Sequence, residues 1–334
     1  MRILLTGARG QLGRELLPLL SAAGDVVAVG HAECDFASPK AVRELVASAR
    51  PTVIVNPAAY TAVNEAEANR ELAFAINSAA PGALAEEAQK CGAMLVHYST
   101  DYVFDGSKEG SYDEFDVPAP LNVYGASKLA GERAVAAAGG RYLVLRTSWL
   151  YGPGGNNFLL TIRRLARERE ELRIVDDQVG GPTSSLQLAH ATARIVREWA
   201  TASESDFPAG LYHATAGGSV SWFGFAQAIV DALVPNSPAN SRKAEREAER
   251  GDPFRLQRIV PIKSAEHPTP ARRPLNSVLC NFKFERTFGF CLANWELGLA
   301  EVVRELRRRE GGAGWRDDTT GSGSWNPGPA RNLA

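Results

Sequence analysis

The chain has 334 residues, of which 45% are hydrophobic and 22% are charged. That length and composition are typical of a globular protein with a full core, arranged as one large domain or two ordinary ones. The formal net charge of −1 provides no basic field that would gather polyanions, so we expect no nucleic-acid partner. The four cysteines lack CxxC spacing and nearby histidines, which argues against a zinc site and against a disulfide framework.

The chain starts with a short apolar run, Ile3-Leu4-Leu5, that leads directly into a glycine turn. This run is too short for the apolar core of a signal peptide, and no later run approaches the length needed to span a membrane. We therefore expect a cytoplasmic protein with no membrane partner.

Over the first 150 residues, short β-rich runs alternate with helical patterns. Strands are expected at Arg2–Thr6, Val26–Val29, Thr52–Asn56, Met94–Ser99 and Tyr142–Arg146. Apolar stripes and an Ala/Glu-rich run between them predict helices. The alternation predicts an α/β fold with a doubly wound, parallel, Rossmann-type sheet, and a dinucleotide-binding domain over residues 1–150.

After Trp149 the regular alternation is interrupted. Pro/Gly-rich segments at 151–155 and 179–183 indicate loops that could line a cleft. We expect a smaller, mainly C-terminal substrate-binding domain over residues 151–310. It is interleaved with the first domain, which receives a returning segment near 184–200.

Two segments differ in composition from the rest of the chain. Residues 236–251 have a breaker-rich start followed by interleaved opposite charges, which favours a solvated surface helix over a nucleic-acid contact. Residues 311–334 are rich in Gly, Ser, Asp and Pro, which predicts a disordered tail.

A glycine-rich turn, Thr6–Gly13, lies between the first expected strand and the first expected helix. Glycines at positions 7, 10 and 13 allow a tight turn and a close approach of backbone N–H groups to a pyrophosphate, which would rest at the helix N-terminus. A glycine turn alone can be structural. Its place at the start of an α/β pattern predicts a dinucleotide site.

The second expected strand ends at Val29-Gly30-His31, without the acidic residue that usually binds the ribose 2′-hydroxyl of NAD. Glu33 lies further into the loop. Arg9 could bind a 2′-phosphate through a charge-assisted hydrogen bond, or it could be a solvated turn residue. We expect NADPH to be the preferred cofactor, with NADH possible.

Tyr124 and Lys128 are four residues apart, so both side chains lie on one face of a helix. An ammonium beside a phenol lowers the pKa of the phenol by favouring the phenolate. Such pairs also occur on ordinary helix surfaces. Together with the glycine turn and with Thr100 at the end of an expected strand, this pair predicts a carbonyl reductase.

These motifs resemble the extended short-chain dehydrogenase/reductase superfamily, and within it the dTDP-4-dehydrorhamnose reductase family. The match runs from Met1 to about Arg308. Six separated segments carry the finer resemblance: Val55–Val63, His97–Phe104, Pro120–Gly125, Arg146–Tyr151, Asn156–Phe158 and Pro268–Pro274.

The resemblance implies reduction of the C4 ketone of dTDP-4-dehydro-6-deoxy-L-mannose to dTDP-L-rhamnose with NAD(P)H. It implies three catalytic residues, of which Tyr124 donates the proton, Thr100 hydrogen-bonds the same oxygen and Lys128 also binds the nicotinamide ribose. The implied cofactor-binding residues are Gly7, Arg9, Gly10, Gln11, Leu12, Gly13, Asp35, Phe36, Ala58, Ala59, Tyr60, Tyr124 and Lys128. The implied substrate-binding residues are Thr61, Val63, Thr100, Asp101, Tyr102, Trp149, Arg272 and Arg273.

Two of these substrate positions have alternative interpretations. Trp149 follows a buried strand and could instead be core packing. The arginine pair Arg272 and Arg273 could bind the diphosphate as bidentate donors, or could form surface ion pairs.

Some members of this family form a magnesium-bridged dimer through three carboxylate positions. Glu15 is retained here, whereas Leu186 and Asn294 stand at about the other two positions. Because magnesium requires oxygen ligands, of which carboxylates are the usual source, we predict no magnesium site, and a monomer or weak homodimer.

Three kinds of enzyme and one non-enzyme compete with this interpretation. A nucleotide-sugar dehydratase usually has Asp-Glu after the catalytic Thr, whereas this chain has Asp101-Tyr102, so dehydration is disfavoured. Another nucleotide-sugar reductase or a 4-epimerase differs in the shape of its pocket, which the sequence leaves open. A non-catalytic NADP-binding regulatory subunit, like the relative that modulates methionine adenosyltransferase, is disfavoured by the intact Thr100, Tyr124 and Lys128.

Overall fold

The structure is a computed structural model that describes residues 1–233 and 254–311. The surface helix expected at 236–251 and the disordered tail expected from residue 312 onward lie outside these residues, so both stay predictions.

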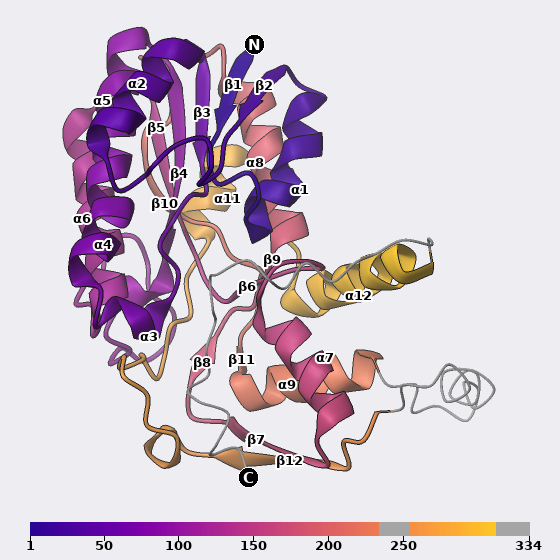
Figure 1. The fold of residues 1–334 in the computed structure, drawn as a ribbon. Coiled ribbons are helices and arrows are strands. Elements are labelled where there is room, and N and C mark those ends of the chain that lie inside the picture. The colour runs from indigo at the N-terminus through magenta and orange to yellow at the C-terminus, as the bar shows by residue number, and fades with distance from the viewer. Residues whose placement is uncertain (234–253, 312–334) are drawn as a thin grey trace.

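The centre of the molecule is a parallel sheet of six strands in the order β10-β5-β4-β3-β1-β2 (Figure 1). Its strands are β1 (Arg2–Leu5), β2 (Asp25–Ala28), β3 (Val53–Asn56), β4 (Met94–Thr100), β5 (Tyr142–Thr147) and β10 (Gly210–His213). The five strands expected from the first 150 residues are confirmed, as is the α/β fold class. The edge strand β10 was not expected, because its four residues carry no distinctive β pattern.

Helices cover both faces of the sheet (Figure 1). One face is covered by α1 (Gln11–Ser21), α8 (Ser185–Trp199) and α11 (Phe282–Phe288), and the other by α2 (Pro39–Ala49), α5 (Ala80–Cys91) and α6 (Val123–Ala138). Burying both faces explains why the strands are apolar along their whole length instead of alternating.

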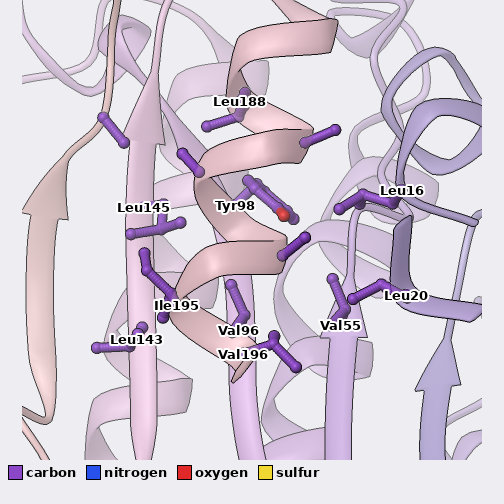
Figure 2. Packing of buried hydrophobic residues seen from close by; sticks show 14 of the residues in the cluster. Leu16, Leu20, Val55, Val96, Tyr98, Leu143, Leu145, Leu188, Ile195 and Val196 are labelled. Carbon is purple, nitrogen blue, oxygen red and sulfur yellow. The ribbon is translucent and has the colours of Figure 1, made fainter. Parts of the chain in front are cut away.

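The packing on the first face brings distant segments together (Figure 2). Leu16 and Leu20 of α1 and Leu188 and Ile195 of α8 cover the sheet residues Val96, Tyr98, Leu143 and Leu145. Residues 185–199 therefore contribute to the core under the first strand, although about 180 residues separate them from it in the sequence.

A second layer of elements lies below the carboxyl ends of the sheet strands (Figure 1). It contains β6 (Leu150–Tyr151), α7 (Phe158–Glu168), β7 (Glu171–Val175), β8 (Val179–Gly180), β9 (Thr183–Ser184), β11 (Val220–Ser221), α9 (Trp222–Leu233), β12 (Arg258–Ile262), η4 (Ser264–Glu266) and α12 (Trp295–Gly311). The strands form three short pairs, β12 with β7, β6 with β9 and β11 with β8. The core of this layer is aromatic and aliphatic, with Phe158, Ile162, Phe225 and Val302 buried.

The chain passes between the two layers several times, since β6 belongs to the lower layer, α8 and β10 to the sheet, and α9 again to the lower layer. The boundaries expected at 1–150, 184–200 and 151–310 stay predictions. Short helices α3 (Val63–Ala66), α4 (Arg70–Phe74), η1 (Ala75–Ala79, a π-helix) and η2 (Asp101–Val103) follow β3 and β4. They begin at the sheet edge where the site lies.

Candidate active site

The turn after β1 packs so closely against neighbouring backbone that only glycine fits at two of its positions. Gly7 has φ +53°, and a Cβ there would lie 2.8 Å from the backbone nitrogen of Ala58. A Cβ on Gly13 would lie 2.2 Å from the carbonyl oxygen of Gly7. Helix α1 begins after Gly10 without a side-chain cap, so the N–H groups of its first turn have no capping side chain. The remaining predicted residues of the turn, Gln11 and Leu12, form the first turn of α1, and this cradle suits a pyrophosphate.

The loop after β2 places a carboxylate beside this cradle. Glu33 accepts a hydrogen bond from the backbone N–H of Gly30 at 2.7 Å and pairs with the guanidinium of Arg9, also at 2.7 Å. Glu33 lies in the loop after β2, and these two bonds bring its side chain back beside the cradle. Arg9 is 73% exposed and remains accessible to a second anion.

Asp35 and Phe36 face in different directions. Asp35 is exposed, and its Oδ1 accepts a hydrogen bond from the backbone of Ala37 at 2.9 Å. Phe36 is 3% exposed and packs in the core with Val42 and other residues under β1 and β3. Only Asp35 of this pair presents its side chain to solvent.

Ala58, Ala59 and Tyr60 follow β3 and are half-buried. Their loop is held by Asn77 of η1, a residue that the sequence analysis did not single out. Its Oδ1 accepts from the backbone N–H of Tyr60 at 2.8 Å, and its Nδ2 donates to the carbonyl of Tyr60 and to Oγ of Ser127, both at 3.0 Å. The sequence signal that could have found Asn77 was a single amide side chain in an Ala-rich helical stretch.

Thr100, Tyr124 and Lys128 meet at the carboxyl end of β4. Thr100 is the last residue of β4, Tyr124 lies in the first turn of α6, and Lys128 follows one turn later. The hydroxyls of Thr100 and Tyr124 are hydrogen-bonded, and the ring of Tyr102 contacts that of Tyr124 edge-on, with centroids 6.0 Å apart.

Two glycines let α6 approach its neighbours. A Cβ on Gly125 would lie 2.1 Å from the carbonyl oxygen of Tyr102, and one on Gly131 would lie 2.0 Å from that of Asn77. The N-terminus of α6 is capped by Asn122, whose side chain accepts from the backbone N–H of Gly125 at 2.8 Å. Backbone contacts thus fix where the helix presents Tyr124 and Lys128.

Burial governs the protonation of both side chains. Burial raises the pKa of Tyr124, with a smaller opposing effect from its hydrogen bond with Thr100. The expected lowering of this pKa by the ammonium of Lys128 is therefore wrong for the structure: Tyr124 keeps its proton at neutral pH. Burial lowers the pKa of Lys128 to about 8, and the nearby carboxylate of Glu132 opposes that effect.

A buried ion pair lies behind Lys128. Glu132, one turn further along α6, binds Nε and Nη2 of Arg146 on β5 at 2.8 and 2.7 Å, and accepts a hydrogen bond from Ser99 on β4 at 2.5 Å. The Glu132 and Arg146 side chains are 7% and 2% exposed. This network was not expected from the sequence, although Arg146, as the single charge in the apolar run 142–146, was a signal for a buried partner.

A chain of polar groups crosses the sheet beside this network. Thr6 donates to Asn56 at 2.5 Å, and Nδ2 of Asn56 lies 3.0 Å from Nδ1 of His97. Burial and the nearby charge of Lys128 hold the pKa of His97 well below its ordinary value, so its imidazole is neutral. Lys128 and Arg146 are thus the cations buried between the sheet and α6.

The predicted substrate residues fall into two groups. Asp101 and Tyr102 form η2 directly beside Thr100, and Asp101 is 2% exposed. Thr61 is exposed and Val63 half-buried at the start of α3.

Arg273 reaches the α3 side of the site, whereas Arg272 does not show such contacts. Arg273 donates to Thr269 at 2.6 Å and to Asn64 at 3.2 Å, and it contacts the phenol of Tyr102. The side chain of Arg272 is exposed.

Trp149 joins the two layers of the molecule. Its ring is parallel to that of Trp222, with centroids 3.5 Å apart, and its backbone has φ +44°. A left-handed conformation at a non-glycine residue is strained and is commonly retained at functional sites. Because the side chain is half-buried, one part packs on Trp222 while another part stays accessible.

The three family carboxylate positions do not converge on a metal. Glu15 pairs with Arg309 of α12 at 3.2 Å, Leu186 packs with the apolar core of the lower layer, and Asn294 is exposed. Among residues 1–233 and 254–311, no three His, Cys, Asp or Glu side chains cluster in a way that could hold a metal ion. The absence of a magnesium site stays a prediction.

In residues 1–233 and 254–311, no helix combines the length and apolar character needed to cross a membrane.

The parallel sheet, the glycine cradle and the Thr100, Tyr124 and Lys128 cluster together define the class of extended short-chain dehydrogenases/reductases. A model of the RmlD substrate binding domain family matches residues 1–308. The chain belongs to this family, and to its dTDP-4-dehydrorhamnose reductases, in which the relatives below also lie.

The chain is 45% identical over 312 residues to a dTDP-4-dehydrorhamnose reductase of Burkholderia thailandensis, which covers 92% of this chain and 99% of that protein. A crystal structure of a dTDP-4-dehydrorhamnose reductase from Clostridium acetobutylicum superposes with a TM-score of 0.80 at 36% identity, covering 92% and 100% of the two chains. The Bacillus anthracis enzyme, solved in complex with NADP, superposes with a TM-score of 0.78 at 36% identity, covering 91% and 99%.

Proposed function

We propose that this protein reduces the C4 ketone of dTDP-4-dehydro-6-deoxy-L-mannose to dTDP-L-rhamnose with NADPH. The observation that carries the proposal is the meeting of Thr100, Tyr124 and Lys128 at the strand edge that also holds the glycine cradle. The names of the relatives support the same sugar and the same reaction.

Each side chain has a separate task in the reduction. NADPH supplies the hydride. Tyr124 holds a phenolic proton near the developing alkoxide and transfers it to that oxygen, because burial keeps the phenol protonated at neutral pH. The hydroxyl of Thr100 donates a hydrogen bond to the same oxygen, and Lys128 would bind the nicotinamide ribose, the other role that the family resemblance implies for it.

The proposal assigns the remaining residues by their place around the cradle. Gly7, Gly10 and Gly13 would hold the pyrophosphate, with Ala58 and Ala59 opposite them. Arg273 and Trp149 would contact the nucleotide sugar. The protein would act in the cytoplasm as a monomer or weak homodimer, without magnesium.

The test is the oxidation of NADPH by the purified protein with enzymatically prepared dTDP-4-dehydro-6-deoxy-L-mannose, with dTDP-L-rhamnose identified by NMR. Turnover that needs both the sugar and NADPH supports the proposal. A protein that binds NADPH and leaves the sugar unchanged would be a cofactor-binding subunit, and a product inverted at C4 without net oxidation would indicate an epimerase.

Cofactor preference provides a separate prediction, which concerns Arg9 and Glu33. Arg9→Ala should raise the KM for NADPH by about tenfold, equal to roughly 1.4 kcal/mol, and leave the KM for NADH almost unchanged, because only NADPH carries a 2′-phosphate. Glu33→Gln should lower the KM for NADPH, since it releases Arg9 from its ion pair. Steady-state kinetics with both cofactors test this, and equal effects on the two KM values would contradict it.

A further inference from the structure

Asp101, one of the implied substrate-binding residues, has no task in the proton transfer above, yet its carboxyl group contacts the residue that polarises the ketone. Its Oδ1 lies 3.0 Å from the hydroxyl oxygen of Thr100. Its Oδ2 is buried and has no hydrogen-bond partner in the described part of the chain. The protonation state of this buried carboxyl group therefore decides the direction of its hydrogen bond with the hydroxyl of Thr100.

The hydroxyl of Thr100 can donate one hydrogen bond and accept two. The backbone N–H of Tyr102 already fills one acceptor position, at 3.1 Å. When Asp101 is ionised it can only accept, so the proton of Thr100 points to Oδ1 and away from a ketone. When Asp101 is protonated on Oδ1 it donates to Thr100 and fills the second acceptor position. With the ketone bound, Tyr124 donates to the ketone in place of its hydrogen bond with Thr100, so the Thr100 proton is available to the substrate as well.

The unpartnered Oδ2 decides which oxygen of Asp101 carries the proton. Oδ2 has no hydrogen bond of good geometry, although the hydroxyl of Ser277 lies near the carboxyl group, so a proton on Oδ2 would have a poor acceptor and cost more than an unpaired carbonyl oxygen. A proton on Oδ1 has an acceptor at 3.0 Å in the hydroxyl of Thr100. The protonated form therefore donates to Thr100.

We propose that Asp101 is a positioning residue that must be protonated for Thr100 to donate its hydrogen bond to the ketone. This inference rests on the proposed function and adds a control of protonation to it. A protonated Asp101 is neutral, so it adds no negative charge beside the oxygen that becomes negatively charged during the reaction.

The surroundings of Asp101 support titration near neutral pH. Burial raises the pKa of Asp101 to about 7, and the nearby hydroxyls of Ser277 and Thr100 oppose this rise. The titratable groups that face it are the phenols of Tyr102 and Tyr124.

The charged groups nearest to this cluster belong to neighbouring elements. Arg273, from the loop before Ser277, contacts the phenol of Tyr102. Lys128 faces Glu132 on its own helix and His97 on β4. Of the residues that the structure describes, none forms a salt bridge with Asp101, so hydrogen-bond donors and not a cation oppose the effect of its burial.

The turnover number should fall as the pH rises through 7, because ionised Asp101 captures the proton of Thr100. Between pH 6 and pH 8 this loss amounts to about tenfold for a single group of that pKa. Lys128, with a pKa of about 8, adds a further loss of about twofold at pH 8.

The pH profile of kcat for the wild type, Asp101→Asn and Thr100→Val tests the proposal. Asn donates to Thr100 at every pH, so Asp101→Asn should lose the decline near pH 7 and keep the later decline of Lys128. In Thr100→Val, with its lower kcat, the choice of Asp or Asn at position 101 should no longer alter the profile. A decline near pH 7 that persists in Asp101→Asn would overturn the proposal.

A measurement without turnover separates this inference from the proposed function. In protein labelled with ¹³C at the aspartate carboxyl carbon, the signal that Asp101→Asn removes should titrate near pH 7, and Thr100→Val should move that pKa upward by removing a donor to the carboxylate. Titration near the ordinary value of about 4 would overturn the inference even in an active enzyme. An inactive wild type with titration near 7 would refute only the proposed function.

Discussion

Tyr124→Phe should lower kcat by about 10² to 10⁴-fold, because the phenol is the group positioned to give a proton to the carbonyl oxygen. The substitution removes one hydroxyl and keeps the ring that contacts Tyr102 edge-on, so the packing around it changes little. Binding of NADPH, measured by fluorescence titration, should change far less than kcat, because the lost interaction is one made in the transition state.

Tyr98→Phe is the matched control for this variant. Tyr98 lies on β4 and faces α8, on the side of the sheet opposite to α6 and Tyr124, where its hydroxyl lies 2.8 Å from that of Thr192 (Figure 2). Its loss should reduce the free energy of unfolding by about 1 kcal/mol and leave kcat unchanged. If Tyr124→Phe turned over as fast as Tyr98→Phe, another group would have to supply the proton.

Glu132→Gln should reduce the free energy of unfolding by about 3–5 kcal/mol, because it leaves the guanidinium of Arg146 buried without a countercharge. The measurement is urea unfolding followed by circular dichroism at neutral pH. A partial amide contact with Arg146 replaces the two charged hydrogen bonds, so the lost Coulomb attraction dominates the effect.

Two further variants distinguish a buried charge from a general intolerance of substitution. Glu198→Gln breaks an exposed pair with Arg194 and should cost less than about 1 kcal/mol. Glu132→Met combined with Arg146→Met should recover most of the lost stability, because neither charge of the pair then remains buried without its partner. A double variant as unstable as Glu132→Gln would contradict this account.

Local patterns in the sequence were sufficient for five of the six strands of the sheet and for the cluster of Thr100, Tyr124 and Lys128. A buried strand such as Met94–Thr100 is an uninterrupted apolar run, and the spacing of Tyr124 and Lys128 is set by the pitch of a single helix. In a parallel sheet the strand ends meet at one edge, which places Thr100 at the same edge as the glycine turn, with the end of β3 between them.

Features that depend on the tertiary structure could not be predicted in this way. Glu33 returns to Gly30 only because the loop closes through the Arg9 pair. The pKa of Tyr124 depends on burial that the whole fold imposes, and so its direction differs from the one that the helical spacing suggested. Glu132 and Arg146 lie 14 positions apart on different elements, and no short-range pattern connects them.

The passage of the chain between layers has a consequence for synthesis on the ribosome. The sheet receives its edge strand β10 at residues 210–213, and its core is completed by Phe284 and Phe288 of α11. A nascent chain that ends after β5 exposes the apolar surface of Leu143 and Leu145, which these later segments cover. Most of the protein must therefore leave the exit tunnel before the cofactor-binding sheet closes, so its apolar surface stays uncovered for longer than in a chain whose domains follow each other in sequence.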